Sequence, residues 1–127
     1  MRGIRGATTV EANDRDQILA RTTELLEAIV ELNGVRPEDL ASVWFTVTPD
    51  LDAEFPAFAA RELGWTEVPL ICGQEIAVPG ALAKCIRVLI HWNTDRTQSE
   101  VRHAFLRGAR TLRPKWAVDL DRLGGAS

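Results

Sequence analysis

The sequence predicts a single α/β domain of the α+β kind, in which a mixed β-sheet packs with two main helices. Three observations indicate this fold class. Segments of strand and helix character alternate along the chain, as they do where helices cover a sheet. The length of 127 residues is that of one domain. Contents of 46% hydrophobic and 26% charged residues are ordinary for a folded globular protein.

The first half of the chain predicts two strands separated by a long helix. Residues 3–10 carry β-branched side chains in loose alternation, which is typical of a strand. Apolar residues recur at helical spacing over residues 15–32, with Asp14 in a capping-box pattern before them and Gly34 after them. We expect the charged face of this helix to be solvated. Residues 42–48 are rich in β-branched and aromatic side chains and predict the second strand.

The second half predicts two further helices and two further strands. A proline suits the first turn of a short helix over residues 56–63. Residues 68–72 and 84–92 have strand character, with an irregular stretch between them. A second capping box opens a helix predicted over residues 97–107, and a short extended piece is predicted at residues 110–113.

The predicted elements leave one face of the sheet without a cover. Two helices cannot cover both faces of a sheet of four or five strands. An apolar sheet face must be buried against something, and a second copy of the chain is the common solution. The sequence therefore predicts a homo-oligomer.

Composition argues against several classes of partner. A net charge of −3 and a pI near 5.4 lack the basic excess of nucleic-acid binders. No apolar run approaches the roughly 18 residues that a membrane helix needs, and the N-terminus lacks a signal-peptide core. Cys72 and Cys85 form no CxxC pair, which argues against structural zinc and suits free thiols in a reducing compartment. We expect a cytoplasmic protein with no metal, cofactor, membrane or nucleic-acid partner.

Two arginines stand in segments that predict strands. Arg87 is the one charge in the apolar run 85–90, and an arginine is almost never fully buried without a partner. Arg87 therefore reaches solvent, pairs with an internal acid or binds an anionic ligand, and the residues alone leave these readings open. Arg5 lies similarly between Gly3 and Gly6. Two such arginines in a small sheet favour a doubly anionic ligand.

Known catalytic motifs are missing from the sequence. No nucleophile elbow, P-loop or dinucleotide fingerprint appears. From residue type alone, Glu75 is an exposed loop acid and Cys72 an inert, buried thiol.

A series of short motifs carries a family resemblance over residues 2–114. The N-terminal motif, Arg2–Glu11, reads RGIRGATTVE. Further motifs are Thr48–Leu51, Phe55–Ala57, Ala60–Leu63, Val68–Pro69 with Cys72, Gln74–Glu75, Cys85–Val88, Asn93–Asp95, Val101–His103 and Leu112–Pro114. Their order and spacing resemble the monofunctional, trimeric α/β class of chorismate mutase. The resemblance implies a domain at residues 1–114, and we expect residues 115–127 to form a mobile tail.

The resemblance implies an activity and an assembly. The family rearranges chorismate to prephenate, on the route to phenylalanine and tyrosine, by an intramolecular Claisen reaction. This reaction needs no metal, covalent intermediate or proton transfer. The family's fold is a homotrimer around a barrel-like core, with active sites in clefts between subunits.

The resemblance also assigns roles to residues of this sequence. Arg87 matches the arginine that donates to the ether oxygen of the breaking bond, where negative charge develops. Glu75 matches the acid that accepts from the ring hydroxyl, and Arg5 the arginine that binds a substrate carboxylate. The remaining pocket positions are Cys72 near the ring hydroxyl, Phe55, Ala57 and Arg61 from a neighbouring subunit, Leu70, Ile71 and Leu112 along the wall, and Arg113 where the C-terminal segment folds over the site.

One departure from the family pattern concerns Phe105. The family usually has a tyrosine there, and this chain contains no tyrosine. The missing hydroxyl predicts weaker substrate binding rather than loss of activity.

Two other functions fit the same resemblance. A trimeric module could hold a small carboxylated ligand without converting it, or the scaffold could hydrolyse imines or enamines, because a fold does not fix a function. The joint presence of Arg5, Glu75 and Arg87 discriminates between them, since a carboxylate binder has no clear use for Glu75.

Overall fold

Five strands form one mixed sheet in the computed structural model, which describes residues 1–125. The strands are β1 (Arg2–Thr9), β2 (Leu40–Val47), β3 (Leu70–Gln74), β4 (Cys85–Trp92) and β5 (Ala104–Phe105). Their order across the sheet is β3-β2-β4-β1-β5. The pairs β1–β4 and β2–β4 are antiparallel, whereas β1–β5 and β2–β3 are parallel. The predicted mixed sheet is confirmed.

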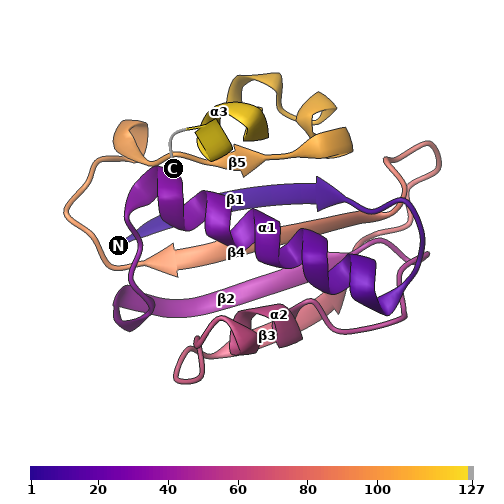
Figure 1. The fold of residues 1–127 in the computed structure, drawn as a ribbon, viewed down its shortest axis with the longest axis horizontal. Helices are drawn as coiled ribbons and strands as arrows, with labels where there is room; N and C mark the ends of the chain where they lie inside the picture. The colour runs from indigo at the N-terminus through magenta and orange to yellow at the C-terminus, as the bar shows by residue number, and fades with distance from the viewer. Residues whose placement is uncertain (126–127) are drawn as a thin grey trace.

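Two helices lie on the same face of this sheet (Figure 1). Helix α1 (Arg15–Asn33) crosses the face diagonally, and α2 (Ala57–Glu62) lies over its β3 edge. The short α3 (Leu120–Gly125) lies beyond β5. Four 3-10 turns complete the described chain, at Pro37–Asp39, Gln98–Glu100, Arg107–Thr111 and Pro114–Trp116. Within residues 1–125, no α-helix covers the opposite face, which we call the open face, and only the 3-10 turns after β5 pack against its end near Ala7 and Phe105.

Helix α1 has the ends that the sequence predicts. The Asp14 side chain accepts from the backbone N–H of Gln17, and Gly34 ends the helix at φ 73°, a conformation that glycine adopts without strain. The apolar side of α1 packs on the sheet close to β1. A Cβ at Gly6 would lie 3.0 Å from both Ile29 Cδ1 and Val88 Cγ1, so a larger residue would push these side chains away by a few tenths of an ångström.

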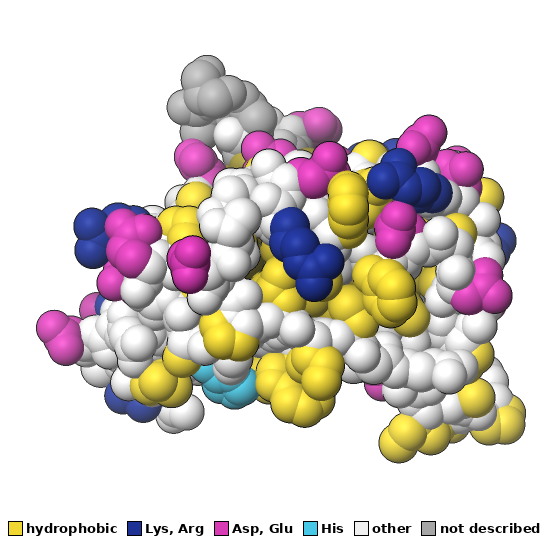
Figure 2. Space-filling model, turned by 90° about the horizontal axis from the view of Figure 1, so that it is seen from below, with side chains coloured by type: hydrophobic (Ala, Val, Ile, Leu, Met, Phe, Trp, Pro, Cys, Tyr) yellow, Lys and Arg dark blue, Asp and Glu magenta, His cyan; other side chains and the backbone are white. Residues whose placement is uncertain are grey.

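Alternation along the strands separates the core from the open face. In β4, Ile86, Val88 and Ile90 are buried on the helix side, whereas Arg87 and Leu89 lie on the open face. Trp44 of β2 and Ile71 of β3 pair on the open face, and each is half exposed. Seen from the side of β3 and α2, hydrophobic side chains gather across the middle of the molecule (Figure 2).

Two predictions for the C-terminal part are wrong. The helix predicted over residues 97–107 is only a 3-10 turn, although its capping box between Thr97 and Glu100 is present. The chain then leaves the turn to form β5, where Ala104 pairs with Gly6, and pairing with β1 replaces further helical hydrogen bonds. The extended piece predicted at residues 110–113 is instead a 3-10 turn over Arg107–Thr111, which begins as soon as the chain leaves β5.

The remaining elements match with small shifts. The strand predicted at residues 68–72 is found at Leu70–Gln74, and the short second helix and the fourth strand are where we expect them. The segment from residue 115 carries the second half of a 3-10 turn and α3, and Val118 N–H donates to the Phe105 carbonyl at 3.0 Å. The mobility of residues 115–127 stays a prediction, and residues 126–127 lie outside the described part.

Candidate active site

The open face of the sheet brings the predicted arginines together. Arg87 of β4 pairs with Ala7 of β1 on one side and with Thr46 of β2 on the other. Arg5 of β1 pairs with Leu89, two residues further along β4, so both arginines point to the same face. A cavity of about 390 Å³ lies here. It is lined by Arg5, Trp44, Thr46, Glu75, Arg87, Val88, Leu89 and His91.

Glu75 is held in place directly after β3. Its backbone N–H donates to the Val47 carbonyl at 2.8 Å. Its Oε2 accepts a hydrogen bond of 2.5 Å from the Thr46 hydroxyl and lies 3.5 Å from Arg87 Nε. Because the Glu75 carboxylate accepts from a hydroxyl and lies beside a guanidinium, its orientation is defined, unlike that of a solvated loop carboxylate.

Arg87 keeps hydrogen-bonding capacity at the cavity. Its Nε is buried and makes no hydrogen bond to any residue that the structure describes, because Glu75 Oε2 lies beyond good hydrogen-bond distance. The side chain as a whole is 32% exposed. A buried donor without an acceptor is rare in proteins, and a bound ligand can supply the acceptor.

Arg5 lies in a positive environment. Burial is the main cause that lowers its pKa below the usual value, and the charges of Arg113 and Arg87 lower it further, while Glu75 acts in the opposite direction. Three arginines and one glutamate thus act on the same region. Such a site favours a ligand with two negative charges.

The C-terminal segment contributes the aromatic side of the site. Phe105 of β5 is fully buried and packs with Leu112 and Trp116. The guanidinium carbon of Arg5 lies 5.4 Å from the centre of the Phe105 ring. Arg113 begins the turn that carries Trp116, and its guanidinium carbon lies 5.4 Å from the Trp116 ring. Six of the predicted site residues therefore gather in one chain: Arg5, Glu75, Arg87, Phe105, Leu112 and Arg113.

A second group of predicted residues lies elsewhere in the chain. Phe55 and Cys72 line a separate cavity of about 640 Å³. Cys72 faces the helix side of β3, where Ala57 and Arg61 of α2 act on it, and burial raises the pKa of its thiol, which does not suit a nucleophile. Leu70 is half-buried and packs against the core next to them.

Ile71 belongs to neither group. It lies on the open face next to Trp44, with half of its surface exposed. One chain alone therefore does not bring all twelve predicted residues to one cavity.

Sequence reasoning missed two residues of the site. The Thr46 hydroxyl holds Glu75 by a hydrogen bond. Side chains alternate along β2, which puts Thr46 on the face opposite Phe45, and this pattern could have indicated Thr46 from the sequence. Trp116 contacts both Arg5 and Arg113 by ring faces, and no sequence pattern signals such a contact.

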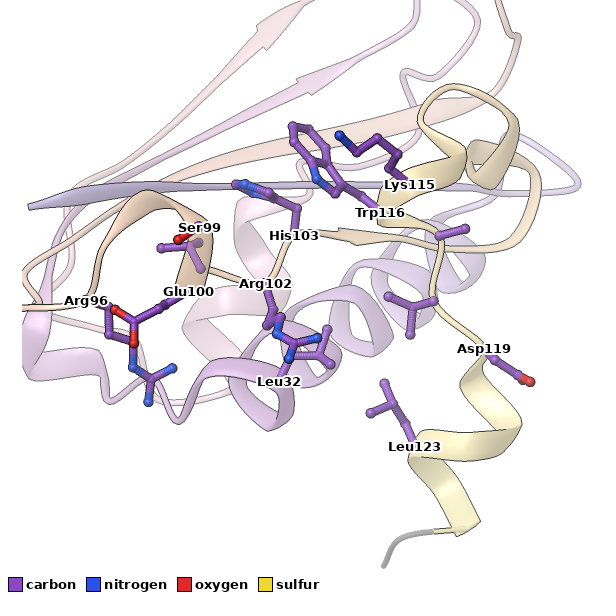
Figure 3. Close-up of a pocket in the computed structure, with 13 residues that line it drawn as sticks. Leu32, Arg96, Ser99, Glu100, Arg102, His103, Lys115, Trp116, Asp119 and Leu123 are labelled. Carbon is purple, nitrogen blue, oxygen red and sulfur yellow. The ribbon is translucent and has the colours of Figure 1, made fainter.

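A cavity of about 920 Å³, larger than the two described above, is at another place. It lies between residues 96–103 and the C-terminal segment, where Arg102, Trp116 and Leu123 are among its lining (Figure 3). It contains neither Arg5, Glu75 nor Arg87. Convergent charged groups rather than volume identify the candidate site.

Among residues 1–125 there is no group of three or more His, Cys, Asp or Glu side chains that could hold a metal ion. No helix of the same residues is both long and apolar enough to cross a membrane.

Comparison with known proteins gives consistent matches. The family model described as chorismate mutase type I matches residues 1–116. The chain is 50% identical over 115 residues to chorismate mutase AroH of Bacillus subtilis (strain 168), covering 90% of this chain and 91% of that protein. It is 52% identical over 115 residues to chorismate mutase AroH of Thermus thermophilus, covering 90% and 94%. A solved structure, chorismate mutase from Clostridium thermocellum Cth-682, is similar with a TM-score of 0.86 and 51% identity, covering 87% of this chain and 99% of that one.

Proposed function

This chain belongs to the type I chorismate mutase family, and from that membership we infer that it rearranges chorismate to prephenate in the cavity lined by Arg5, Glu75 and Arg87. One observation carries the assignment of the site. Arg5, Arg87 and an oriented glutamate, Glu75, line one cavity of the open face, and the charge of Arg113 acts on Arg5 beside it. Chorismate has the matching groups: two carboxylates, a ring hydroxyl and an ether oxygen.

The reaction places few chemical demands on the protein. Within one molecule, the ether C–O bond breaks while a C–C bond forms, so atoms and electrons balance without water, metal or an external acid or base. The protein must hold the substrate in its folded reactive conformer and stabilise the charge that develops on the ether oxygen.

We assign the stabilisation of that charge to Arg87. Its Nε is buried without a hydrogen bond, and a guanidinium presents its N–H donors in a rigid, planar fork. A donor that is fixed before the reaction stabilises the transition state without reorganisation, and in many enzymes this effect supplies most of the rate acceleration. Glu75 orients Arg87 and offers its carboxylate to the ring hydroxyl.

We assign the binding of the substrate carboxylates to Arg5 and Arg113. Both contact aromatic rings, and the effect of Arg113 on the pKa of Arg5 indicates that their charges are close. Two fixed carboxylates would hold the substrate in the conformer in which the reacting carbons meet.

We propose a homotrimer with a barrel-like core and active sites between subunits. Two features support this assembly. The open face carries exposed Trp44, Ile71 and Leu89, and such an apolar patch is typical of a protein interface. The group around Phe55 and Cys72 is the part that a single chain keeps away from the arginines, and a neighbouring subunit could bring it to them.

We also propose that the protein works in the cytoplasm and serves phenylalanine and tyrosine synthesis. Both cysteines, Cys72 and Cys85, are free thiols, which suits a reducing compartment. The site residues include no group that needs a cofactor for the proposed reaction.

The loss of chorismate absorbance with purified protein tests the activity, and Arg87 tests the site. Arg87→Ala should lower kcat by at least 10²–10³-fold, about the cost of losing one oxyanion donor. Arg87→Lys should also be strongly impaired, because a flexible point charge does not reproduce the guanidinium fork. Arg36→Ala is the matched control, since Arg36 is 67% exposed and makes only surface ion pairs.

The outcomes separate the proposed function from its alternatives. If Arg87→Ala changes only KM, Arg87 is a carboxylate anchor and the assignment of its role is wrong. A wild-type protein that binds prephenate but leaves chorismate unchanged would be a carboxylate-binding module. Activity on imines without activity on chorismate would favour the hydrolase.

A further inference from the structure

The guanidinium of Arg5 is held by aromatic rings instead of acids. Its carbon atom lies 5.4 Å from the centre of the Phe105 ring and 5.9 Å from that of Trp116. Within residues 1–125, its side chain makes no ion pair within 4 Å and no hydrogen bond. The two ring faces are therefore the contacts that orient it.

Trp116 is itself fixed by His103. The centres of the two rings lie 4.1 Å apart, and Figure 3 shows the His103 and Trp116 side chains next to each other. His103 Nδ1 accepts a hydrogen bond of 2.9 Å from the backbone N–H of Arg5. Burial, and then the charge of Arg5, lower the pKa of His103, which favours the neutral ring that this bond requires. His103 thus connects the backbone of Arg5 to the ring that holds its side chain.

An aromatic face has an advantage over a carboxylate at this position. A carboxylate would occupy the N–H groups at the edge of the guanidinium, whereas a ring contacts its plane and leaves those donors for a ligand. Arg113 and Arg87 carry the same charge as Arg5, and after burial their repulsion is the next cause that lowers the pKa of Arg5. Trp116 also lies 5.4 Å from the guanidinium carbon of Arg113, so one indole contacts two like-charged arginines.

We propose that Trp116 is a positioning residue for the substrate-binding arginines: its indole, supported by His103, holds the guanidinium groups of Arg5 and Arg113 with their N–H donors free for the substrate carboxylates. The proposal rests on the proposed function for the identity of the substrate. Its geometric part, the contact between Trp116 and Arg5, stands independently of that function.

The kinetic test removes the π-face and keeps apolar bulk. Trp116→Leu should raise KM for chorismate about 2- to 30-fold, the range of a cation–π contact between partly desolvated groups, with a smaller change in kcat. Trp116→Phe should recover most of the affinity, because it restores a ring. Lys115→Ala is the matched control in the same turn, and its KM should equal that of the wild type.

A double-mutant cycle separates positioning from general support of the fold. If Trp116 acts through Arg5 and Arg113, the Trp116→Leu effect should shrink in an Arg5→Ala background and disappear when Arg113→Ala is added. An equal effect in all three backgrounds, or an unchanged KM in Trp116→Leu, would overturn the proposal.

Two readouts keep this test distinct from that of the proposed function. Binding of prephenate measured by calorimetry should weaken in Trp116→Leu even if the wild type does not convert chorismate. The rings of Phe105 and Trp116 should shift the NMR signal of the Arg5 Nε–H group upfield in the wild type, and this signal should move toward the usual arginine position in Trp116→Leu. If the signal stays in place, Trp116 does not hold Arg5, whatever the enzyme does.

Discussion

At the scale of one residue, the effect of the missing tyrosine hydroxyl at Phe105 can be tested by a single substitution. Its ring is fully buried and the Arg5 guanidinium lies over it. Phe105→Tyr should leave kcat nearly unchanged and lower KM for chorismate, because one hydrogen bond to a substrate carboxylate contributes on the order of 0.5–1.5 kcal/mol, and somewhat more with a charged partner. Steady-state kinetics of the two proteins measures both constants.

A large rise of kcat in Phe105→Tyr would contradict this prediction and would place the hydroxyl at the reacting atoms. A rise of KM would show instead that the buried ring has no room for another oxygen, which overpacks the cluster with Leu112 and Trp116.

Sequence patterns located some of the site residues and missed others for physical reasons. Arg87 stands out because a charge in an apolar strand needs an explanation, whereas Glu75 looks like any loop acid until its contact with Thr46 is known. The place of Glu75 came from the family resemblance. No sequence pattern indicated Trp116, because the packing of its ring on a guanidinium depends on the tertiary structure alone.

At the scale of elements, local signals predicted the first helix well and the last predicted helix badly. The Asp14 side chain caps the first helix, and a full capping box between Thr97 and Glu100 opens the second segment. After Gly34 the first helix simply ends, whereas the segment after Glu100 reaches the free edge of β1 and pairs with it. Sheet hydrogen bonds there, such as Leu106 N–H to the Ala7 carbonyl at 2.9 Å, end the helical turn at once. Cap chemistry is local, while strand pairing depends on residues about 100 positions away.

One ion pair joins the long helix to the segment after β5. Glu24 of α1, on the face predicted to be only solvated, receives two hydrogen bonds from Arg107, at 2.7 and 2.9 Å. The hydrogen bond from Arg107 is the main cause that lowers the pKa of Glu24, and burial acts in the opposite direction. The Arg107 side chain is 37% exposed, so solvent screens the pair.

Glu24→Gln should therefore lower the free energy of unfolding at pH 7 by about 0.5–1 kcal/mol. A carboxyl whose pKa is depressed by folding stabilises the fold above its unfolded pKa, and that contribution is lost as pH falls through the folded value. The difference between variant and wild type should thus be largest at neutral pH and vanish in acid. Urea unfolding at neutral pH and in acid, at the same protein concentration, measures this difference.

Glu27→Gln is the control for this experiment, because Glu27 is exposed on the same helix. Equal losses in the two variants would mean that the Arg107 contact contributes nothing specific. A Glu24→Gln effect that persists unchanged in acid would show a cause other than the charge.

At the scale of the whole molecule, the two groups of site residues predict complementation between subunits. If each active site takes Arg87 from one chain and Arg61 from its neighbour, Arg61→Ala and Arg87→Ala should each be strongly impaired. Co-expressed in equal amounts, they should regain about a quarter of the wild-type activity, because random mixing leaves that share of interfaces intact.

Light scattering on the same samples should give three chains per particle. A monomer at micromolar concentration, or a mixture no more active than the average of the separate variants, would contradict sites shared between subunits. A dimer would still be compatible with a site shared between subunits, but the predicted number of subunits would be wrong.

The pairing register of β1 and β4 limits how this sequence can change length during evolution. Arg5 and Arg87 face the same cavity only because Arg5 pairs with Leu89 and Ala7 with Arg87. One inserted or deleted residue within β4 would turn Arg87 into the core and an apolar side chain into the site. The exposed loop from Ile76 to Lys84 has no such constraint, since Thr9 pairs with Cys85 at its end and resets the register. Length variation among descendants of this protein should therefore accumulate in that loop, while the strands on either side of it keep their length.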